Sequence, residues 1–185
     1  MSEYELTRVR LNDGAETTVY LVRHPIATTS VRVLCFREPE RLDHWCVANG
    51  HPEAIVAGFF VRDPYRPLGE VRIDGDDREG FTAGAAQFDS DITVGRHPRC
   101  ALGLGEAELL AVCCDGRRTG VDGGLALAEL ARLLISLGAI EAINLDGGGS
   151  ATLVHHGHLL NRPYSHQDQP APESRPVVTA LLFES

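Results

Sequence analysis

The sequence predicts an α+β fold, in which one or two helices pack on a single mixed, mostly antiparallel sheet. Short β-rich runs outnumber helical stretches, two pairs of runs are typical of hairpins, and one later segment has a clear helical pattern. The chain has 185 residues, of which 43% are hydrophobic and 23% charged, as in ordinary globular proteins. At this length we expect one domain that spans residues 1–185.

The first half reads mainly as strands. In chain order we expect strands at 19–22 and 31–36, a helix over 40–48 that ends at Asn49-Gly50, a buried strand at 54–60, and turns with a short strand over 61–80. A proline-containing turn separates the first two strands.

The second half has clearer boundaries. We expect a hairpin of 101–104 with 109–113, a helix over 125–137, a strand at 139–145, a hairpin of 152–155 with 158–160, and a closing strand at 177–183. The apolar residues of the helix share one face, and Gly138 follows its end.

All 17 basic residues are arginines, so the chain contains no lysine. This excludes a Schiff-base lysine, a pyridoxal-phosphate anchor, a P-loop lysine and Ser–Lys catalysis. Codon bias explains the absence most simply, but any bound anion must then be held by arginine, histidine or main-chain N–H groups. The net charge of −9 and the lack of a basic cluster argue against nucleic acid or an anionic membrane as a partner.

The chain as given has no segment that indicates export or membrane insertion. No run approaches the roughly 18 apolar residues of a membrane span, and the acidic N-terminus lacks an apolar signal region, so we expect a cytoplasmic protein. The five cysteines are an odd number without a CxxC pair. They therefore indicate buried thiols in a reducing compartment and neither a disulfide framework nor a zinc ribbon.

The segment from Asn144 to Ser150 is the most informative in the chain. Three consecutive glycines (Gly147, Gly148 and Gly149) follow a predicted buried strand and would let a ligand approach main-chain N–H groups closely. Asp146 stands at the end of that strand as a candidate catalytic or metal-binding carboxylate. The alternative is a tight turn capped by Asp146. Ser150 does not complete the GxSxG motif of serine hydrolases.

A second candidate group comprises Asp115 and Arg117, which follow the predicted strand at 109–113. A carboxylate beside a guanidinium suits a ligand that is both sugar and phosphate, and the alternative is a surface ion pair. Arg99 and Arg175, each next to a predicted strand, taken alone indicate only surface charge.

The histidines His155, His156 and His158 flank the turn of the later predicted hairpin. They suit either zinc ligands or exposed strand ends.

In order along the chain, these segments resemble the phosphodiester glycosidase family. The matching segments are Phe59-Phe60, Pro67 to Gly69, Arg99 to Gly103, Asp115 to Arg117 with Gly120, Leu127 to Ala131, Asn144 to Ser150, Asn161 to Pro163 and Arg175 to Val177. The resemblance covers roughly residues 50–183 and is strongest over 99–183. Where the family commonly has Asn-Gly-Gly before the Phe pair, this chain has Val56-Ala57-Gly58, so a polar group of the family's site is expected to be absent.

The resemblance implies hydrolysis of a sugar–phosphodiester bond at the anomeric carbon, on a small-molecule or glycan sugar-phosphate. Asp146 would act as base or nucleophile, with Asp115 as the second carboxylate and Asn144 on sugar hydroxyls. The phosphate would be held by Arg99, Arg117, Arg175 and the backbone of Gly147 to Ser150. No cofactor is required, although a divalent metal is compatible, and family members are usually exported. The sequence does not indicate an oligomeric state.

Two other classes stay open at this point. One is a non-catalytic module that binds glycans or phosphosugars. The other is a metal-dependent phosphodiesterase with Asp146, Asp115 and a histidine as ligands.

Overall fold

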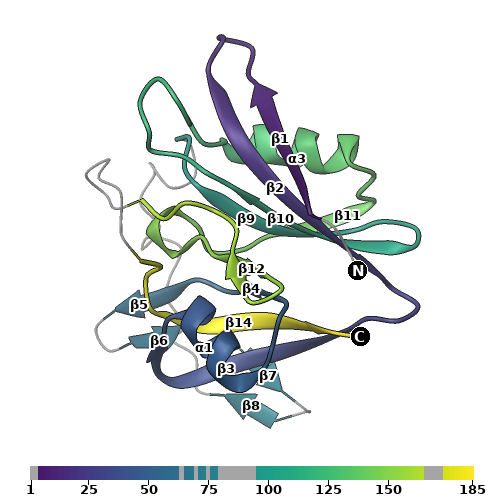
Figure 1. The fold of residues 1–185 in the computed structure, drawn as a ribbon, viewed down its shortest axis with the longest axis vertical. Coiled ribbons are helices and arrows are strands. Elements are labelled where there is room, and N and C mark those ends of the chain that lie inside the picture. The colour runs from purple at the N-terminus through teal and green to yellow at the C-terminus, as the bar shows by residue number, and fades with distance from the viewer. Residues whose placement is uncertain (1–3, 63–64, 69–70, 74–75, 79–94, 165–172) are drawn as a thin grey trace.

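The computed structural model describes residues 4–62, 65–68, 71–73, 76–78, 95–164 and 173–185. It confirms the α+β class, with strands predominating over helices (Figure 1). The strands form two five-stranded sheets, where the sequence indicated one. Every strand pair in the described part of the chain is antiparallel.

The first sheet combines the N-terminal hairpin with the middle of the chain. Its strands, in spatial order, are β1 (Glu5–Arg10), β2 (Glu16–Pro25), β10 (Glu108–Cys114), β9 (Arg99–Leu104) and β11 (Glu141–Asn144). The helix α3 (Leu127–Ser136) packs on its outer face. The predicted hairpin of 101–104 with 109–113 is therefore confirmed as β9–β10.

The second sheet closes with the C-terminal strand. In spatial order it contains β13 (His158–Leu159), β12 (Leu153–His155), β4 (Ala54–Val56), β14 (Val177–Glu184) and β3 (Ser30–Glu40). The helix α1 (Leu42–Asn49) packs against β4 and β12 and ends at Gly50, as predicted. Two small hairpins lie outside the two five-stranded sheets. They are formed by β5 (Phe60–Arg62) with β6 (Tyr65–Pro67) and by β7 (Val71–Ile73) with β8 (Asp76–Arg78).

The side chains of β2 show why two layers cover the first sheet. Val19 and Leu21 belong to the cluster that includes α3, whereas Tyr20 and Val22 belong to the cluster shared with the second sheet. Because successive side chains of a strand point to opposite faces, an apolar run of this kind needs cover on both. The run is apolar throughout, so its composition does not say which element covers which face.

The predicted strand at 54–60 is interrupted. β4 ends at Val56 and β5 begins at Phe60, and the main chain of Ala57 bonds to two different segments. Its N–H donates to the Thr179 carbonyl at 3.1 Å, and its carbonyl accepts from the N–H of Asp146 at 2.8 Å. At the position where the chain departs from the family pattern, Ala57 thus contacts Asp146 through its main chain.

All five cysteines are free thiols, and four of them are buried. Cys100 and Cys113 face each other across β9 and β10, with their sulfur atoms 3.3 Å apart. Among the helices that the structure describes, none is both long and apolar enough to cross a membrane.

Three glycines pack against the main chain of His97 and Pro98. A Cβ on Gly116 would lie 2.7 Å from the Pro98 nitrogen, one on Gly124 2.6 Å from the His97 carbonyl carbon, and one on Gly147 2.6 Å from the Pro98 oxygen. These three glycines come from the loop after β10 and from the segment after β11. Any side chain there would push two main-chain segments apart.

We expect Gly124→Ala to destabilise the protein by more than about 3 kcal/mol, because it combines a clash with backbone and a positive φ. Gly124 has φ of +80°. Gly120→Ala is the matched control, since Gly120 has φ of +73° but nothing within 4 Å of its Cβ position. It should cost only about 1 kcal/mol. Urea unfolding of both variants measures the difference, and equal losses would contradict the close packing at His97.

Candidate active site: an arginine cluster beside a buried aspartate

Asp146 lies between the two sheets, two residues after β11. Asp146 is only 9% exposed. Its Oδ1 accepts the N–H of Gly147 at 2.8 Å, and the side chain of Ser150 also hydrogen-bonds to it. Ser150 is buried and belongs to the short 3₁₀ helix Gly148–Ser150. The predicted block thus folds into a compact turn around its own carboxylate.

The N–H groups of this turn are largely used internally. Gly147 donates to Asp146, Gly148 donates to the Pro98 carbonyl at 2.8 Å, and Ser150 donates to the Gly147 carbonyl at 3.0 Å. The expected contact of the glycine N–H groups with an anion stays a prediction. What the structure shows is that the glycines allow other groups to approach closely.

Those groups are the guanidinium groups of Arg117 and Arg175. A Cβ on Gly148 would lie 3.0 Å from Nη2 of Arg117, and one on Gly149 would lie 2.5 Å from Nη2 of Arg175. Arg117 follows β10 and Arg175 precedes β14, so the fold brings two distant arginines onto adjacent glycines. Arg117 also has φ of +59°, an uncommon conformation for a non-glycine residue. Such strain is often found at functional sites.

Arg62, at the end of β5, adds a third positive charge. Burial lowers the pKa of Arg175, and the charges of Arg62 and then Arg117 lower it further, against the opposing effect of Asp146. Three guanidinium groups therefore act on one another in this region. Repulsion among like charges is relieved by a bound anion.

Burial also controls the ionisation of Asp146. It raises the pKa of the Asp146 carboxyl from 3.8 to about 6, although the hydrogen bonds of Gly147 and Ser150 and the charges of Arg175 and Arg62 oppose the shift. A carboxyl group with this pKa changes its charge close to neutral pH, as acid–base groups in active sites commonly do.

Arg99 and Asn144 lie at neighbouring positions in the first sheet. Arg99 is buried, with its Nε donating to the Leu125 carbonyl and its Nη2 to the Gly95 carbonyl, each at 3.0 Å. Both of these bonds go to main chain near the loop of Arg117. Asn144 ends β11, and its buried Oδ1 has no hydrogen-bond donor among the described residues.

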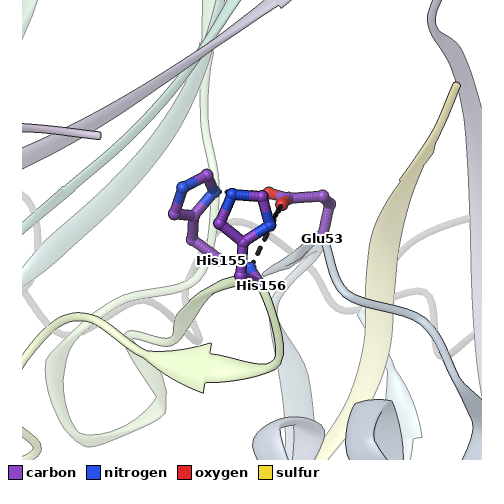
Figure 2. A group of neighbouring side chains, drawn as sticks. All are labelled: Glu53, His155 and His156. Atoms are coloured by element: carbon purple, nitrogen blue, oxygen red, sulfur yellow. Dashed lines mark hydrogen bonds and ion pairs between the residues drawn. The ribbon is translucent and has the colours of Figure 1, made fainter. Parts of the chain in front are cut away.

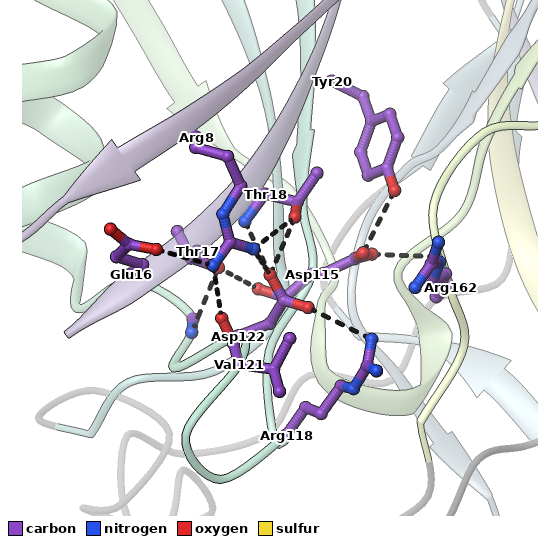
Figure 3. A network of polar contacts seen from close by, with 11 residues as sticks. Arg8, Glu16, Thr17, Thr18, Tyr20, Asp115, Arg118, Val121, Asp122 and Arg162 are labelled. Carbon is purple, nitrogen blue, oxygen red and sulfur yellow. Dashed lines mark hydrogen bonds and ion pairs between the residues drawn. The ribbon is translucent and has the colours of Figure 1, made fainter.

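Asp115 is placed in a separate polar network (Figure 3). Its residue is 2% exposed, and its oxygens accept from the Tyr20 hydroxyl at 3.1 Å and from the N–H of Arg162 at 2.8 Å. Burial raises its pKa to about 6, despite these two hydrogen bonds. Both oxygens of Asp115 are therefore engaged in joining β10 to β2 and to the segment at 161–162.

Asp122 anchors the far side of the same loop. Its Oδ1 accepts from Arg8 at 2.6 Å, from the Thr18 hydroxyl at 2.8 Å and from the Thr18 N–H at 2.9 Å (Figure 3). Arg118 lies within 3.8 Å of its Oδ2. The loop that carries Arg117 is thereby fastened to β1 and β2 at both ends.

The structure brings Asp146, Arg117, Arg175 and the glycine run together, and it places Asp115 and Arg99 in supporting positions. Sequence reasoning missed Arg62, although it closely follows the Phe59-Phe60 segment of the family pattern. A lone arginine at a strand end has no periodicity that distinguishes it from surface charge, so only its electrostatic effect on Arg175 in the folded chain reveals it.

Guanidinium groups clustered beside a buried carboxylate suit an anionic group next to an acid–base or nucleophilic residue. The family model described as phosphodiester glycosidase matches residues 69–184. The chain belongs to this family.

Two relatives are N-acetylglucosamine-1-phosphodiester alpha-N-acetylglucosaminidases. The Homo sapiens protein is 49% identical over 61 residues, which cover 33% of this chain and 12% of the human protein. The Mus musculus protein is 43% identical over 61 residues, which cover 33% of this chain and 11% of the mouse protein. The matched segment thus spans only a small part of these relatives.

Two solved structures share the fold. The zebrafish N-acetylglucosamine-1-phosphodiester alpha-N-acetylglucosaminidase catalytic domain, auto-inhibited by its pro-peptide, aligns with a TM-score of 0.74 at 19% identity, covering 100% of this chain and 83% of that one. A hypothetical protein from Synechocystis aligns with a TM-score of 0.73 at 16% identity, covering 97% and 61%.

We expect Asp146→Asn to raise the free energy of unfolding at pH 7.5 by about 1–3 kcal/mol relative to the wild type, and to leave it unchanged near pH 4. The folded pKa of about 6 exceeds the unfolded value of 3.8, so the folded state binds more protons between these values. Wild-type stability therefore falls as the pH rises from about 4 to 6. Urea unfolding across this range measures the difference.

Asp13→Asn is the control of opposite sign, because the hydrogen bond from Arg96 lowers the pKa of the exposed Asp13. Replacement of the Asp13 carboxylate should therefore not stabilise the protein at pH 7.5. The difference in free energy of unfolding between Asp146→Asn and the wild type should be larger at pH 7.5 than at pH 4. A smaller difference at pH 7.5 would contradict a carboxylate that is buried and ionised at that pH.

Proposed function

We propose that this chain is a hydrolase that cleaves the bond between the anomeric carbon of a sugar and a phosphodiester oxygen. The observation that carries the proposal is the position of Arg117 and Arg175 on Gly148 and Gly149, beside the buried Asp146. Family membership supports the reaction class, and the names of the relatives support N-acetylglucosamine 1-phosphate diesters as the first substrates to test.

The charges suit this reaction better than simple binding. When the C–O bond breaks, its electron pair moves to the phosphate oxygen, so a singly charged diester becomes a doubly charged monoester. Arg117, Arg175 and Arg62 would stabilise that second charge as it develops, which lowers the barrier more than it tightens substrate binding. Because phosphate is already a good leaving group, little help from a general acid is needed.

Asp146 would supply the second requirement. As a base it would take a proton from the water whose oxygen bonds to the anomeric carbon, and as a nucleophile it would bond to that carbon before water releases the sugar. Both roles need the carboxylate form. The buried Oδ1 of Asn144 is suited to accept a hydrogen bond from a sugar hydroxyl.

Asp115 and Arg99 would act as positioning residues. Asp115 fixes the start of the Arg117 loop through Tyr20 and Arg162, and Arg99 holds the carbonyls of Gly95 and Leu125. Neither carboxylate of the site, Asp146 or Asp115, belongs to a cluster of three metal-ligand side chains among the described residues.

Asp146→Asn should lower kcat/KM for an alkyl diester of N-acetylglucosamine 1-phosphate by about 10²–10⁴-fold, because it removes the base or nucleophile. Asp13→Asn should retain wild-type turnover. Activity near the wild-type level in Asp146→Asn would remove Asp146 from the mechanism. Hydrolysis in ¹⁸O-water should place the label on the sugar, and label in the phosphate would instead support the metal-dependent phosphodiesterase.

Gly149→Ala should raise the inhibition constant of inorganic phosphate by about tenfold or more, because the new Cβ displaces the Arg175 guanidinium and weakens a charge-assisted contact. Since the atom displaced is the end of a flexible side chain, the melting temperature should change little. Gly58→Ala is the matched control, with its nearest neighbour at 3.9 Å from the Cβ position. Equal inhibition constants in the two variants would contradict phosphate binding by Arg175.

A further inference from the structure

Glu53, His155 and His156 form a cluster of metal-ligand side chains at the end of β12 that is remote from Ser150 (Figure 2). One potential ligand atom from each residue lies within 4.8 Å of the others. Nδ1 of His155 lies 2.9 Å from Oε2 of Glu53, and Nδ1 of His156 lies 3.3 Å from Oε1. No part of the proposed hydrolysis uses this cluster.

The fold holds the three residues in place. Glu53 immediately precedes β4, His155 ends β12, and these strands are paired with Val154 opposite Ala54. His156 and Gly157 form the two-residue turn to β13, with φ values of +50° and +76°. The N–H of His156 donates to Oε1 of Glu53 at 3.1 Å, which joins the turn to the carboxylate.

Burial differs among the ligands in a way that suits a binding site. His155 and Glu53 have side chains only 4% and 12% exposed, whereas the His156 side chain is 48% exposed. Two of the ligands are therefore fixed by packing. The third, His156, lies on the exposed turn.

A hollow of about 600 Å³ adjoins the cluster, and both Glu53 and His156 line it. His24, stacked on Phe183 with ring centroids 4.1 Å apart, forms another part of the wall. Arg23 also lines the hollow, but its charge is countered by Glu5 at 2.7 Å and Glu108 at 3.0 Å. The hollow gives solvent a route to the cluster.

We propose that Glu53, His155 and His156 bind one divalent transition-metal ion, with zinc as the matching probe, and that the remaining coordination position faces the hollow. Two imidazole nitrogens and one carboxylate are a common ligand set of zinc sites that keep an open position. Ligands in a tetrahedral zinc shell lie about 3.4 Å apart, given bonds of about 2.0–2.2 Å. Nδ1 of His155 lies 2.9 Å from one carboxylate oxygen of Glu53, and Nδ1 of His156 lies 3.3 Å from the other. One ligand atom from each residue lies within 4.8 Å of the others, so the three residues are close enough to share one ion.

A simple ion pair accounts for the cluster less well. One histidine would suffice to pair with Glu53, yet two imidazole rings, with centroids 4.0 Å apart, share one carboxylate. Magnesium and calcium prefer oxygen ligands, so the two nitrogens select against them.

Isothermal titration of the intact chain with ZnCl₂ tests the proposal. We expect one zinc ion per chain for the wild type, with an affinity lowered at least tenfold in His156→Ala and in Glu53→Gln. His156→Ala is the main test, because a half-exposed turn residue can be replaced without disturbing the core. His44→Ala, on the surface of α1 with a side chain 63% exposed, is the matched control and should bind as the wild type does.

Two further readouts separate metal binding from a structural role. Zinc should raise the melting temperature of the wild type and of His44→Ala but not of His156→Ala, since a ligand of the folded state stabilises it. Cobalt(II) should give a visible d–d spectrum that zinc abolishes and that excess magnesium leaves unchanged. No zinc binding by the wild type, or unchanged affinity in His156→Ala and Glu53→Gln, would overturn the proposal.

Discussion

The main chain at His97 and Pro98 is the point on which the rest of the site depends. Three glycines from two other segments approach it so closely that no side chain would fit, and the N–H of Gly148 donates to the Pro98 carbonyl. This contact aligns the start of β9, the Arg117 loop and the glycine run after Asp146. Main-chain packing therefore fixes the positions of the charged residues, and such packing is stiffer than contacts between side chains.

Electrostatics and packing act against each other around Asp146. Burial disfavours its ionised form, and the arginines favour that form while repelling one another. An anion among the arginines would relieve their repulsion, and a carboxylate held near its pKa is ready to exchange a proton. The loop network of Asp122 supplies the rigidity that keeps these unfavourable contacts together.

The two ends of β12 carry chemically different groups. The end near Ser150 adjoins the glycine run that contacts Arg117 and Arg175, whereas the end at His155 holds two imidazoles and one carboxylate (Figure 2). The first set suits an anion and the second a cation. One short buried strand therefore separates two candidate sites that would take ligands of opposite charge.

The local pattern of residues was enough to predict most of the described strands and the helices α1 and α3, because hydrophobic periodicity and the turn preference of glycine are local properties. The resemblance to the family likewise depended on the order of local motifs. The absence of lysine left arginine, histidine and main-chain N–H groups to hold any anion, and the structure gathers two arginines at Gly148 and Gly149.

Only the tertiary structure decided which arginines meet. Arg62 and Arg175 lie 113 positions apart, and nothing in their neighbourhoods marks them as a pair. The division of the strands into two sheets and the meeting of Glu53 with His155 also depend on pairings between distant strands. Such pairings follow from the packing of whole apolar faces, and a sequence pattern shows that a face is apolar without showing what it packs against.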